Sequence, residues 1–145
     1  MNARNIGYWL TTGLLAAAFM AGGVFDLSQS PQVVEGLRHL GYPAYFATIL
    51  GAWKVLGALA LVAPGLPRLK EWAYAGIFFD LSSAAISHVV VHDGADKVFP
   101  SVLLLVFASV SWALRPASRT LASRPGTEAR SKEKLEASWV GARAA

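Results

Sequence analysis

Four long apolar stretches occupy most of the first 114 residues of this chain. Residues 5–25 and 98–114 carry no charged side chain, residues 45–63 carry only Lys54, and residues 72–91 carry Asp80 and His88. A helix needs roughly 20 apolar residues to cross about 30 Å of hydrocarbon, and each stretch is close to that length. The sequence therefore predicts an all-α polytopic membrane protein, a bundle of four transmembrane helices.

Composition supports one membrane domain. Hydrophobic residues make up 54% of the 145 residues and charged residues only 15%, which is too apolar for an ordinary soluble domain. We expect the membrane domain to span residues 1–116. Residues 5–25 are interpreted as a span and not as a cleaved signal peptide, because the uncharged run is long for a signal sequence. Tyr8 and Trp9 also suit an anchor at the membrane interface.

Basic residues predict the orientation of the spans. With four spans, both termini lie on the side of the connection at residues 64–71, and that side holds ten Lys and Arg against Arg38 and Lys97 on the other. This bias predicts a multi-pass membrane protein with both termini in the cytoplasm. Residues 117–145 are predicted to be a basic, flexible cytoplasmic tail that meets anionic lipid and not nucleic acid. The expected cytoplasmic aromatic belt consists of Tyr8, Trp9, Trp72, Tyr74 and Trp112.

A short amphipathic helix is expected between the first two spans. Ser30 followed by Pro31 is a typical helix start, and Gly41 is a typical stop. The apolar face consists of Val33, Val34, Leu37 and Leu40, with Glu35 and Arg38 turned away. We expect this helix to cap the outer end of the bundle.

Small residues predict where the helices pack, because close approach replaces the hydrophobic effect inside lipid. Three rows are candidates for packing faces: Gly13, Ala17 and Ala21 in the first span; Ala47, Gly51, Lys54 and Ala58 in the second; Gly76, Asp80, Ala84 and His88 in the third. The ionisable side chains thus belong to expected seams between helices.

Lys54 and Asp80 are the most informative polar residues. Counted from the connection between their helices, Lys54 lies about 15 Å and Asp80 about 12 Å deep at 1.5 Å per residue. An unpaired charge costs about 2.5–3.5 kcal/mol at mid-membrane, so we expect the two side chains to pair. Three interpretations stay open: a structural ion pair, a polar pocket in which Lys54 holds an anionic or carbonyl-bearing head group, and a proton or ion relay.

Catalytic and cofactor signatures are absent from the sequence. No nucleophile-elbow, phosphate-loop or zinc-protease motif occurs, and the chain has no cysteine for thiol or iron–sulfur chemistry. His88 and His92 have the spacing of two ligands on one helix, but this signal is weak, so no metal site is assigned. We expect no cofactor and no catalytic activity of the chain's own.

Two consecutive segments resemble a known family. LGYPAYFATILGAWKVLGALAL at residues 40–61, followed by LKEWAYAGIFFDLSSAAISH at residues 69–88, is similar to the DoxX-like family of small four-helix bacterial membrane proteins. The resemblance covers roughly residues 5–116. The resemblance implies a location in the bacterial plasma (inner) membrane. Because the family takes its name from a subunit of a thiosulfate:quinone oxidoreductase, the resemblance also implies a link to redox complexes. The resemblance marks Gly41, Tyr42, Pro43, Gly51, Lys54, Gly57, Glu71, Trp72, Ala73, Tyr74, Gly76, Asp80, Ser87 and His88.

These observations favour an accessory or binding subunit that holds a lipid-soluble or amphiphilic molecule, with quinone as one candidate, at the seam between the second and third spans. The alternatives are a small proton-coupled transporter using Lys54, Asp80 and His88, and a component of a membrane oxidoreductase. Expected partners are membrane lipids, a membrane protein or redox complex, and a second copy of the chain. The predicted ligand-binding residues are Lys54, Asp80, His88, Ser87, Gly51 and Gly76, and the predicted interface anchors are Trp72, Glu71 and Tyr42.

Overall fold

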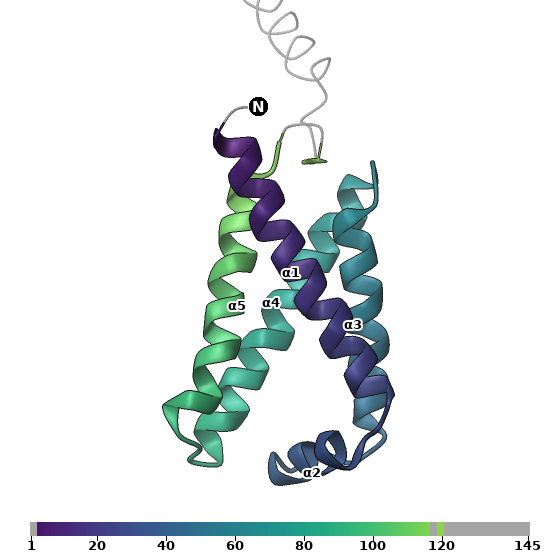
Figure 1. The fold of residues 1–145 in the computed structure, drawn as a ribbon, viewed down its shortest axis with the longest axis vertical. Coiled ribbons are helices and arrows are strands. Elements are labelled where there is room, and N and C mark those ends of the chain that lie inside the picture. Colours follow the sequence, from purple (N-terminus) through teal and green to yellow (C-terminus); the bar gives the residue numbers. More distant parts are fainter. Residues whose placement is uncertain (1–2, 117–118, 121–145) are drawn as a thin grey trace, which may run out of the picture.

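A computed structural model describes residues 3–116 and 119–120, and the part of the chain that it describes is built from helices without strands. The described residues form five α-helices, whose arrangement Figure 1 shows. They are α1 (Ala3–Leu27), α2 (Pro31–His39), α3 (Phe46–Val62), α4 (Pro67–Val90) and α5 (Ala95–Leu114). The predicted all-α fold is confirmed. Most of the predicted basic tail at residues 117–145 lies outside the described residues.

Length and composition make the bundle a membrane domain. Among the described helices, α1, α4 and α5 are long and apolar enough to cross a membrane. α3 is also apolar but has 17 residues, and it runs lengthwise through the bundle beside its neighbours (Figure 1). α4 starts five residues earlier than expected, because Pro67 occupies its first turn, where the missing N–H costs nothing.

The four long helices cross and do not run strictly parallel. α1 lies beside α5 at the end that carries the N-terminus and beside α3 at the end that carries α2 (Figure 1). α4 crosses in the opposite sense, since it begins beside α3 and ends beside α5 (Figure 1). α3 and α4 therefore diverge toward the α2 end of the bundle.

The closest helix contact joins α1 to α3 through two glycines. A Cβ added at Gly51 would lie 2.7 Å from the carbonyl oxygen of Gly23, and one added at Gly23 would lie 2.9 Å from that of Gly51. The α3 packing row is confirmed, because Ala47, Gly51 and Ala58 are buried. The predicted α1 row is wrong: Gly13, Ala17 and Ala21 are exposed, and the buried face of α1 is a different one.

Polar side chains hold α1, α4 and α5 together near the N-terminal end. The Ser111 hydroxyl lies 2.6 Å from the Thr12 hydroxyl and 2.6 Å from the Tyr74 hydroxyl, and all three residues are buried. Buried hydroxyl groups without partners are costly in lipid, so this three-helix network fixes the register of the helices. Leu15, Phe19, Leu81 and others form the apolar core below it.

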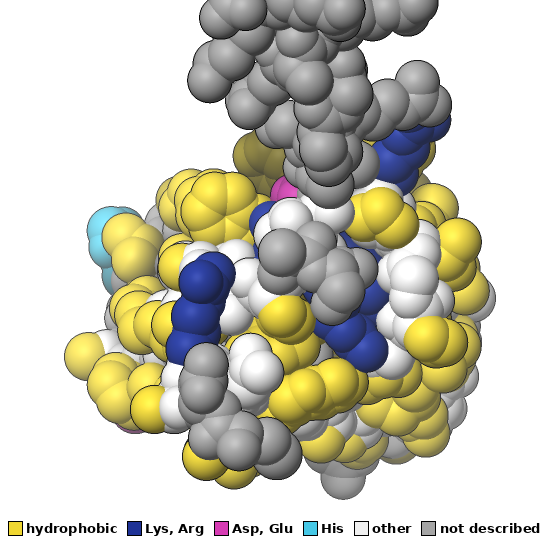
Figure 2. Space-filling model, turned by 90° about the horizontal axis from the view of Figure 1, so that it is seen from above, with side chains coloured by type: hydrophobic (Ala, Val, Ile, Leu, Met, Phe, Trp, Pro, Cys, Tyr) yellow, Lys and Arg dark blue, Asp and Glu magenta, His cyan; other side chains and the backbone are white. Residues whose placement is uncertain are grey.

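The N-terminal end of the bundle is basic, and Figure 2 views the molecule from that end, where several Lys and Arg side chains are visible. Lys70 is fully buried and donates to the carbonyl oxygens of Ala60 at 2.7 Å and Leu61 at 2.8 Å. This ammonium group therefore satisfies carbonyls at the C-terminus of α3 and ties α3 to α4. The sequence analysis counted Lys70 only among the basic residues near the connection at residues 64–71.

Glu71 and the end of α5 form a second link at this end. The Arg115 guanidinium lies 2.8 Å from Glu71, and the Trp112 indole donates to the same carboxylate at 3.2 Å. The predicted aromatic belt is only partly correct, because Tyr8 and Tyr74 are buried in the bundle. Trp9, Trp72 and Trp112 are exposed, as an interfacial position requires.

The predicted amphipathic helix is confirmed as α2. Pro31 lies in its first turn, Val33 is buried, and Glu35 and Arg38 are exposed. Gly41 has φ +85°, a left-handed conformation that glycine adopts without a steric cost, and this turn ends the segment. α2 lies across the end of the bundle opposite the N-terminus (Figure 1).

Candidate functional site

A cavity of about 580 Å³ lies between α3 and α4, with α2 at one end. Most of its lining is apolar. Five polar or charged side chains also line it: Tyr42, Lys54, Asp80, Ser83 and Ser87. Lys70 holds α3 and α4 together at one end, and the two helices diverge from that point. The side chains between them do not fill the resulting space.

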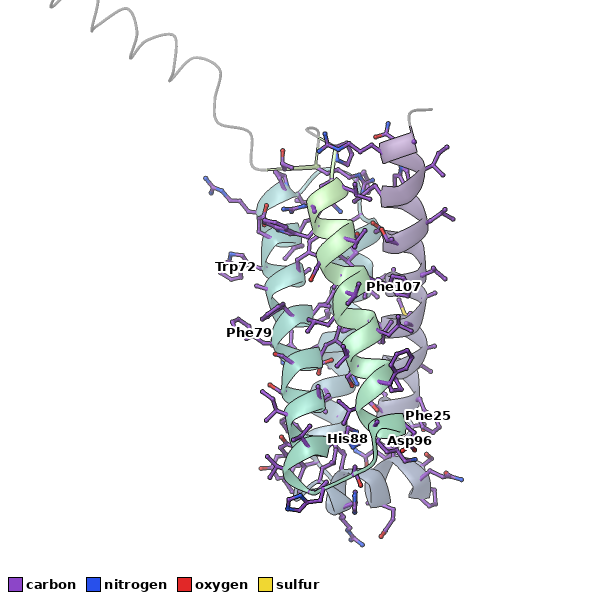
Figure 3. The ribbon with its side chains drawn as sticks, turned by 90° about the vertical axis from the view of Figure 1, so that its left-hand side faces the viewer. Phe25, Trp72, Phe79, His88, Asp96 and Phe107 are labelled. Atoms are coloured by element: carbon purple, nitrogen blue, oxygen red, sulfur yellow. The ribbon has the colours of Figure 1, made fainter. Side chains whose placement is uncertain are left out.

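The mouth of the cavity faces sideways, out of the bundle. Trp53, Leu56, Trp72 and Phe79 line it and are more than half exposed. Figure 3 shows Trp72 and Phe79 projecting outward from α4. Since this lateral surface faces the hydrocarbon in a membrane bundle, a molecule dissolved in the bilayer can reach the cavity without passing through water.

Lys54 is paired across the α1–α3 contact. Its ammonium nitrogen lies 2.8 Å from a carboxylate oxygen of Asp26, near the end of α1, and both side chains are largely shielded. The predicted direct pairing of Lys54 with Asp80 is therefore wrong.

Helix geometry explains why Asp80 is not the partner of Lys54. Because α4 starts at Pro67, Asp80 lies about 20 Å along α4, whereas Lys54 lies about 12 Å from the end of α3 at Val62. The two helices also diverge over this distance. The α1–α3 glycine contact, in contrast, brings Asp26 within reach of the flexible Lys54 side chain.

Asp80 lines the cavity opposite Lys54 and has no hydrogen-bond partner among the described residues. It nevertheless interacts electrostatically with both Lys54 and Asp26. Ser83, one turn further along α4, also lines the cavity without a hydrogen bond to any described residue. The cavity thus contains a carboxylate and a hydroxyl that are free to bind a ligand.

The α2 end of the cavity is closed by the segment that follows α2. The Tyr42 and Ser87 hydroxyls lie 2.8 Å apart, and the Tyr42 ring stacks on Phe46 with centroids 4.8 Å apart. Leu37 and Leu40 add apolar lining. This hydrogen bond connects the LGYP segment to the end of α4, so two of the sequence motifs meet in the structure.

A carboxylate outside the membrane-spanning helices ties α2 to α4. Asp93 accepts from His88 Nδ1 at 2.7 Å on one oxygen and lies 2.7 Å from His39 Nε2 on the other. The hydrogen bond from His88, and next that from His39, lowers the pKa of the Asp93 carboxyl. These two contacts, here called the Asp93 clip, hold α2 against the end of α4.

The histidine pair considered as metal ligands does not form. α4 ends at Val90, and His92 has φ +59°, so His88 and His92 do not share one helical face. His88 and His39 instead approach different oxygens of Asp93. Over residues 3–116 and 119–120, no group of three His, Asp or Glu side chains converges on a common metal position.

The structure brings together four of the six predicted ligand-binding residues. Lys54, Asp80, Ser87 and Gly76 line the cavity. Gly51 instead packs against Gly23, and His88 belongs to the Asp93 clip. Of the predicted anchors, Trp72 lies at the mouth of the cavity, Tyr42 closes it at the α2 end, and Glu71 binds Arg115.

Sequence reasoning missed Asp26 as the partner of Lys54. One signal was available: Asp26 follows Gly23 by three residues, and Lys54 follows Gly51 by three. A glycine one turn before each charge would have indicated a close contact that carries an ion pair. No comparable signal pointed to the Lys70 cap, since a lysine near the end of a span is ordinarily solvated at the interface.

Sequence comparison agrees with this geometry. The sequence model of the DoxX-like family matches residues 10–111, which include all the cavity-lining residues. The chain belongs to the DoxX-like family. The match begins within α1 and ends in the last turn of α5, so it includes parts or all of each of the five helices of this DoxX-like protein.

A relative and the solved structures complete the comparison. An uncharacterized Bacillus subtilis protein, YdgD, is 31% identical over 97 residues, which cover 67% of this chain and 84% of YdgD. No solved structure is significantly similar to this DoxX-like protein. The family and the apolar helices identify a multi-pass integral membrane protein, and its site must be judged on its own geometry.

Proposed function

We propose that this DoxX-like protein is a binding subunit that holds a lipid-soluble or amphiphilic molecule in the cavity between α3 and α4. The observation that carries the proposal is the combination of apolar walls with a small polar group of Lys54, Asp80 and Ser83. An amphiphile presents the same combination, an apolar chain and one polar head, so the cavity matches it chemically.

Size and access support the proposal. The volume of about 580 Å³ lies within the range of roughly 300–1,000 Å³ typical of small-molecule sites. The exposed side chains of Trp72 and Phe79 at the mouth face the region that lipid occupies (Figure 3). A quinone is one candidate ligand, and a lipid or another amphiphile of similar size is equally suitable.

Transport receives less support than binding. The proton-coupled mechanism would use Lys54, Asp80 and His88 in sequence, yet His88 is engaged with Asp93 and lies about 12 Å along α4 from Asp80. A role in an oxidoreductase would rely on a partner for the redox chemistry. We therefore propose an accessory role, with a membrane protein, a redox complex or a second copy of the chain as the partner.

The test is to identify what copurifies with the protein and whether it occupies the cavity. The protein is extracted from native membranes and analysed by mass spectrometry for bound lipids and quinones. Gly76→Leu places a side chain into the cavity, whereas Gly13→Leu makes the same change on the exposed face of α1; a Cβ at either glycine meets no atom within 4 Å. We expect Gly76→Leu to lose the bound molecule and Gly13→Leu to retain it.

A molecule that is retained equally in both leucine variants would occupy another surface, and the proposal would then be wrong. Absence of any stoichiometric amphiphile from the wild-type protein would count against it as well. Copurifying membrane proteins, identified in the same preparation, test the proposed partnership.

We also propose that the protein resides in the plasma membrane with both termini in the cytoplasm. Support comes from the Lys and Arg side chains visible at the N-terminal end of the bundle, in the sense of the positive-inside bias (Figure 2). At this end Arg4 donates to the carbonyl oxygen of Arg115. A reporter that is active only outside the cytoplasm should stay inactive when it is fused after residue 145. Activity of that fusion would reverse the orientation.

A further inference from the structure

We infer that the cavity takes an amphiphile with a positively charged amine head group, held by Asp80. The inference rests on the proposed function and names the class of ligand for the same site. The sequence predicted that Lys54 would hold an anionic head group. The inference reverses this prediction, because Lys54 is already paired with Asp26 in the structure.

The charges at the cavity do not balance. Asp26 and Asp80 are acids, and Lys54 is the only Lys or Arg among the described residues that line the cavity. The 2.8 Å ion pair between Lys54 and Asp26 neutralises both of its members. Asp80 is left without an ion pair at mid-bundle, where its carboxyl group must either hold a proton or meet a cation.

Hydrogen bonding points to the same class of head group. Asp80 accepts no hydrogen bond from any described residue, and neither does the Ser83 hydroxyl one helical turn away. A protonated amine carries several N–H donors and one positive charge. It can therefore donate to the Asp80 carboxylate and to the Ser83 hydroxyl oxygen at once. A carboxylate or phosphate head group would instead add a second anion beside Asp80, which the low dielectric penalises.

The aromatic walls suit a cation. Trp53, Trp72, Phe46 and Phe79 all line the cavity together with Asp80. Aromatic faces attract ammonium groups, and tryptophan does so most strongly. The same rings pack against an alkyl chain, so the walls favour both parts of a cationic amphiphile.

The experiment compares three probes that share one alkyl chain: dodecylamine, dodecanol and laurate. Purified wild-type protein in a neutral maltoside detergent is titrated with each probe at neutral pH, and binding is followed by tryptophan fluorescence. Gly76→Leu, whose added side chain occupies part of the cavity, corrects for partition of each probe into the micelle. We expect dodecylamine to bind at least about tenfold more tightly than dodecanol, and laurate to bind most weakly.

Two variants test the assigned charges. Asp80→Asn removes the carboxylate and should abolish the advantage of dodecylamine while leaving dodecanol binding within about threefold. Asp26→Asn releases Lys54 from its ion pair and should shift the preference toward laurate. Asp96→Asn is the matched control, since this exposed acid at the start of α5 does not line the cavity (Figure 3).

The ranking of the three probes by the wild-type protein needs no variant, so a misfolded mutant does not obscure the result. If all three probes bind equally, or laurate binds best, and Gly76→Leu still abolishes binding, the head-group inference is overturned while the proposed function stands. If no probe binds in a manner that depends on Gly76, the proposed function fails as well.

Discussion

α3 carries a glycine on each of two faces. The neighbouring helix packs closely against one of these faces and stands away from the other. On the α1 side, Gly51 lies directly against the backbone of Gly23, with no room for a Cβ. On the α4 side, Gly57 has its nearest neighbour, an Ile77 side-chain carbon, at 4.0 Å from the position of an added Cβ, and Gly76 has open space. One face is a tight seam, and the other borders a cavity.

The comparison shows that small residues permit close helix contact but do not enforce it. The α1–α3 seam closes because an ion pair, Lys54 with Asp26, crosses it as well. Hydrogen bonds join the two sides of the α3–α4 seam at one end through Lys70 and at the other end through Tyr42 and Ser87. The cavity lies between these two contacts. The open face therefore retains the polar groups that a ligand can use.

The largest expected effect comes from adding one methyl group to each face. Gly51→Ala would place its Cβ against backbone atoms of Gly23 and Leu27, so the helices must separate, and the free energy of unfolding should fall by about 1–3 kcal/mol. Gly76→Ala meets no atom and should leave stability unchanged or raise it by up to about 1 kcal/mol. Unfolding in mixed micelles with increasing SDS measures both.

Equal losses of stability in the two alanine variants would mean that the α3–α4 face is packed as tightly as the α1–α3 face. The contrast between a seam and a cavity would then have no basis. Gly13→Ala, on the exposed face of α1, is the control for the intrinsic helix preference of alanine.

A double-mutant cycle gives the next largest effect. Lys54→Met and Asp26→Asn should be coupled by about 1 kcal/mol, because each single change leaves its partner partly buried and unpaired. The cycle of Lys54→Met with Asp80→Asn should give a coupling below about 0.5 kcal/mol, since no direct ion pair joins these two described residues. The same SDS titration supplies the values.

A stronger coupling of Lys54 to Asp80 than to Asp26 would show that the ion pair belongs to the α3–α4 face. The cavity would then be closed by its own charges. The head-group inference would lose its premise in that case.

The smallest effect concerns the clip at the α2 end. The pKa of Asp93 is lowered in the folded protein, so its stabilising contribution is present above the unfolded-state pKa and is lost as pH falls through the folded-state pKa. A spin label at Gly36→Cys, unique because the chain has no cysteine, should report a mobile α2 only at pH below the ordinary range of aspartate. With Asp93→Asn, the label should be mobile already at neutral pH.

The Asp96→Asn variant serves as the control, since Asp96 is exposed and takes no part in the clip. An unchanged label profile in Asp93→Asn would indicate that α2 is held by its apolar face alone. Tyr42→Phe, which removes the hydrogen bond to Ser87, separates that contact from the clip.

The sequence by itself determined the class of the fold and the elements. Uncharged stretches of the right length identify membrane helices, because hydrocarbon tolerates neither free backbone groups nor unpaired charges. α2 was equally predictable from Pro31 and Gly41, since helix starts and stops depend on local backbone chemistry, although the Ser30 side chain makes no cap hydrogen bond. Lys54, Asp80 and Gly76 were predicted at the α3–α4 seam and line the cavity there. The predicted α4 packing row is wrong, however, because the buried face of α4 is instead the one with Tyr74, Ile77 and Leu81.

Only the tertiary structure decided which groups meet. Lys54 was within reach of Asp80 on a straight bundle, but the crossing of the helices brings it to Asp26 and leaves Asp80 without a direct ion pair. Lys70 likewise became a buried cap because α3 ends beside the first turn of α4. Crossing angles arise from the fit of all the side chains at a contact, so local sequence sets the depth of a charge, while packing chooses its partner.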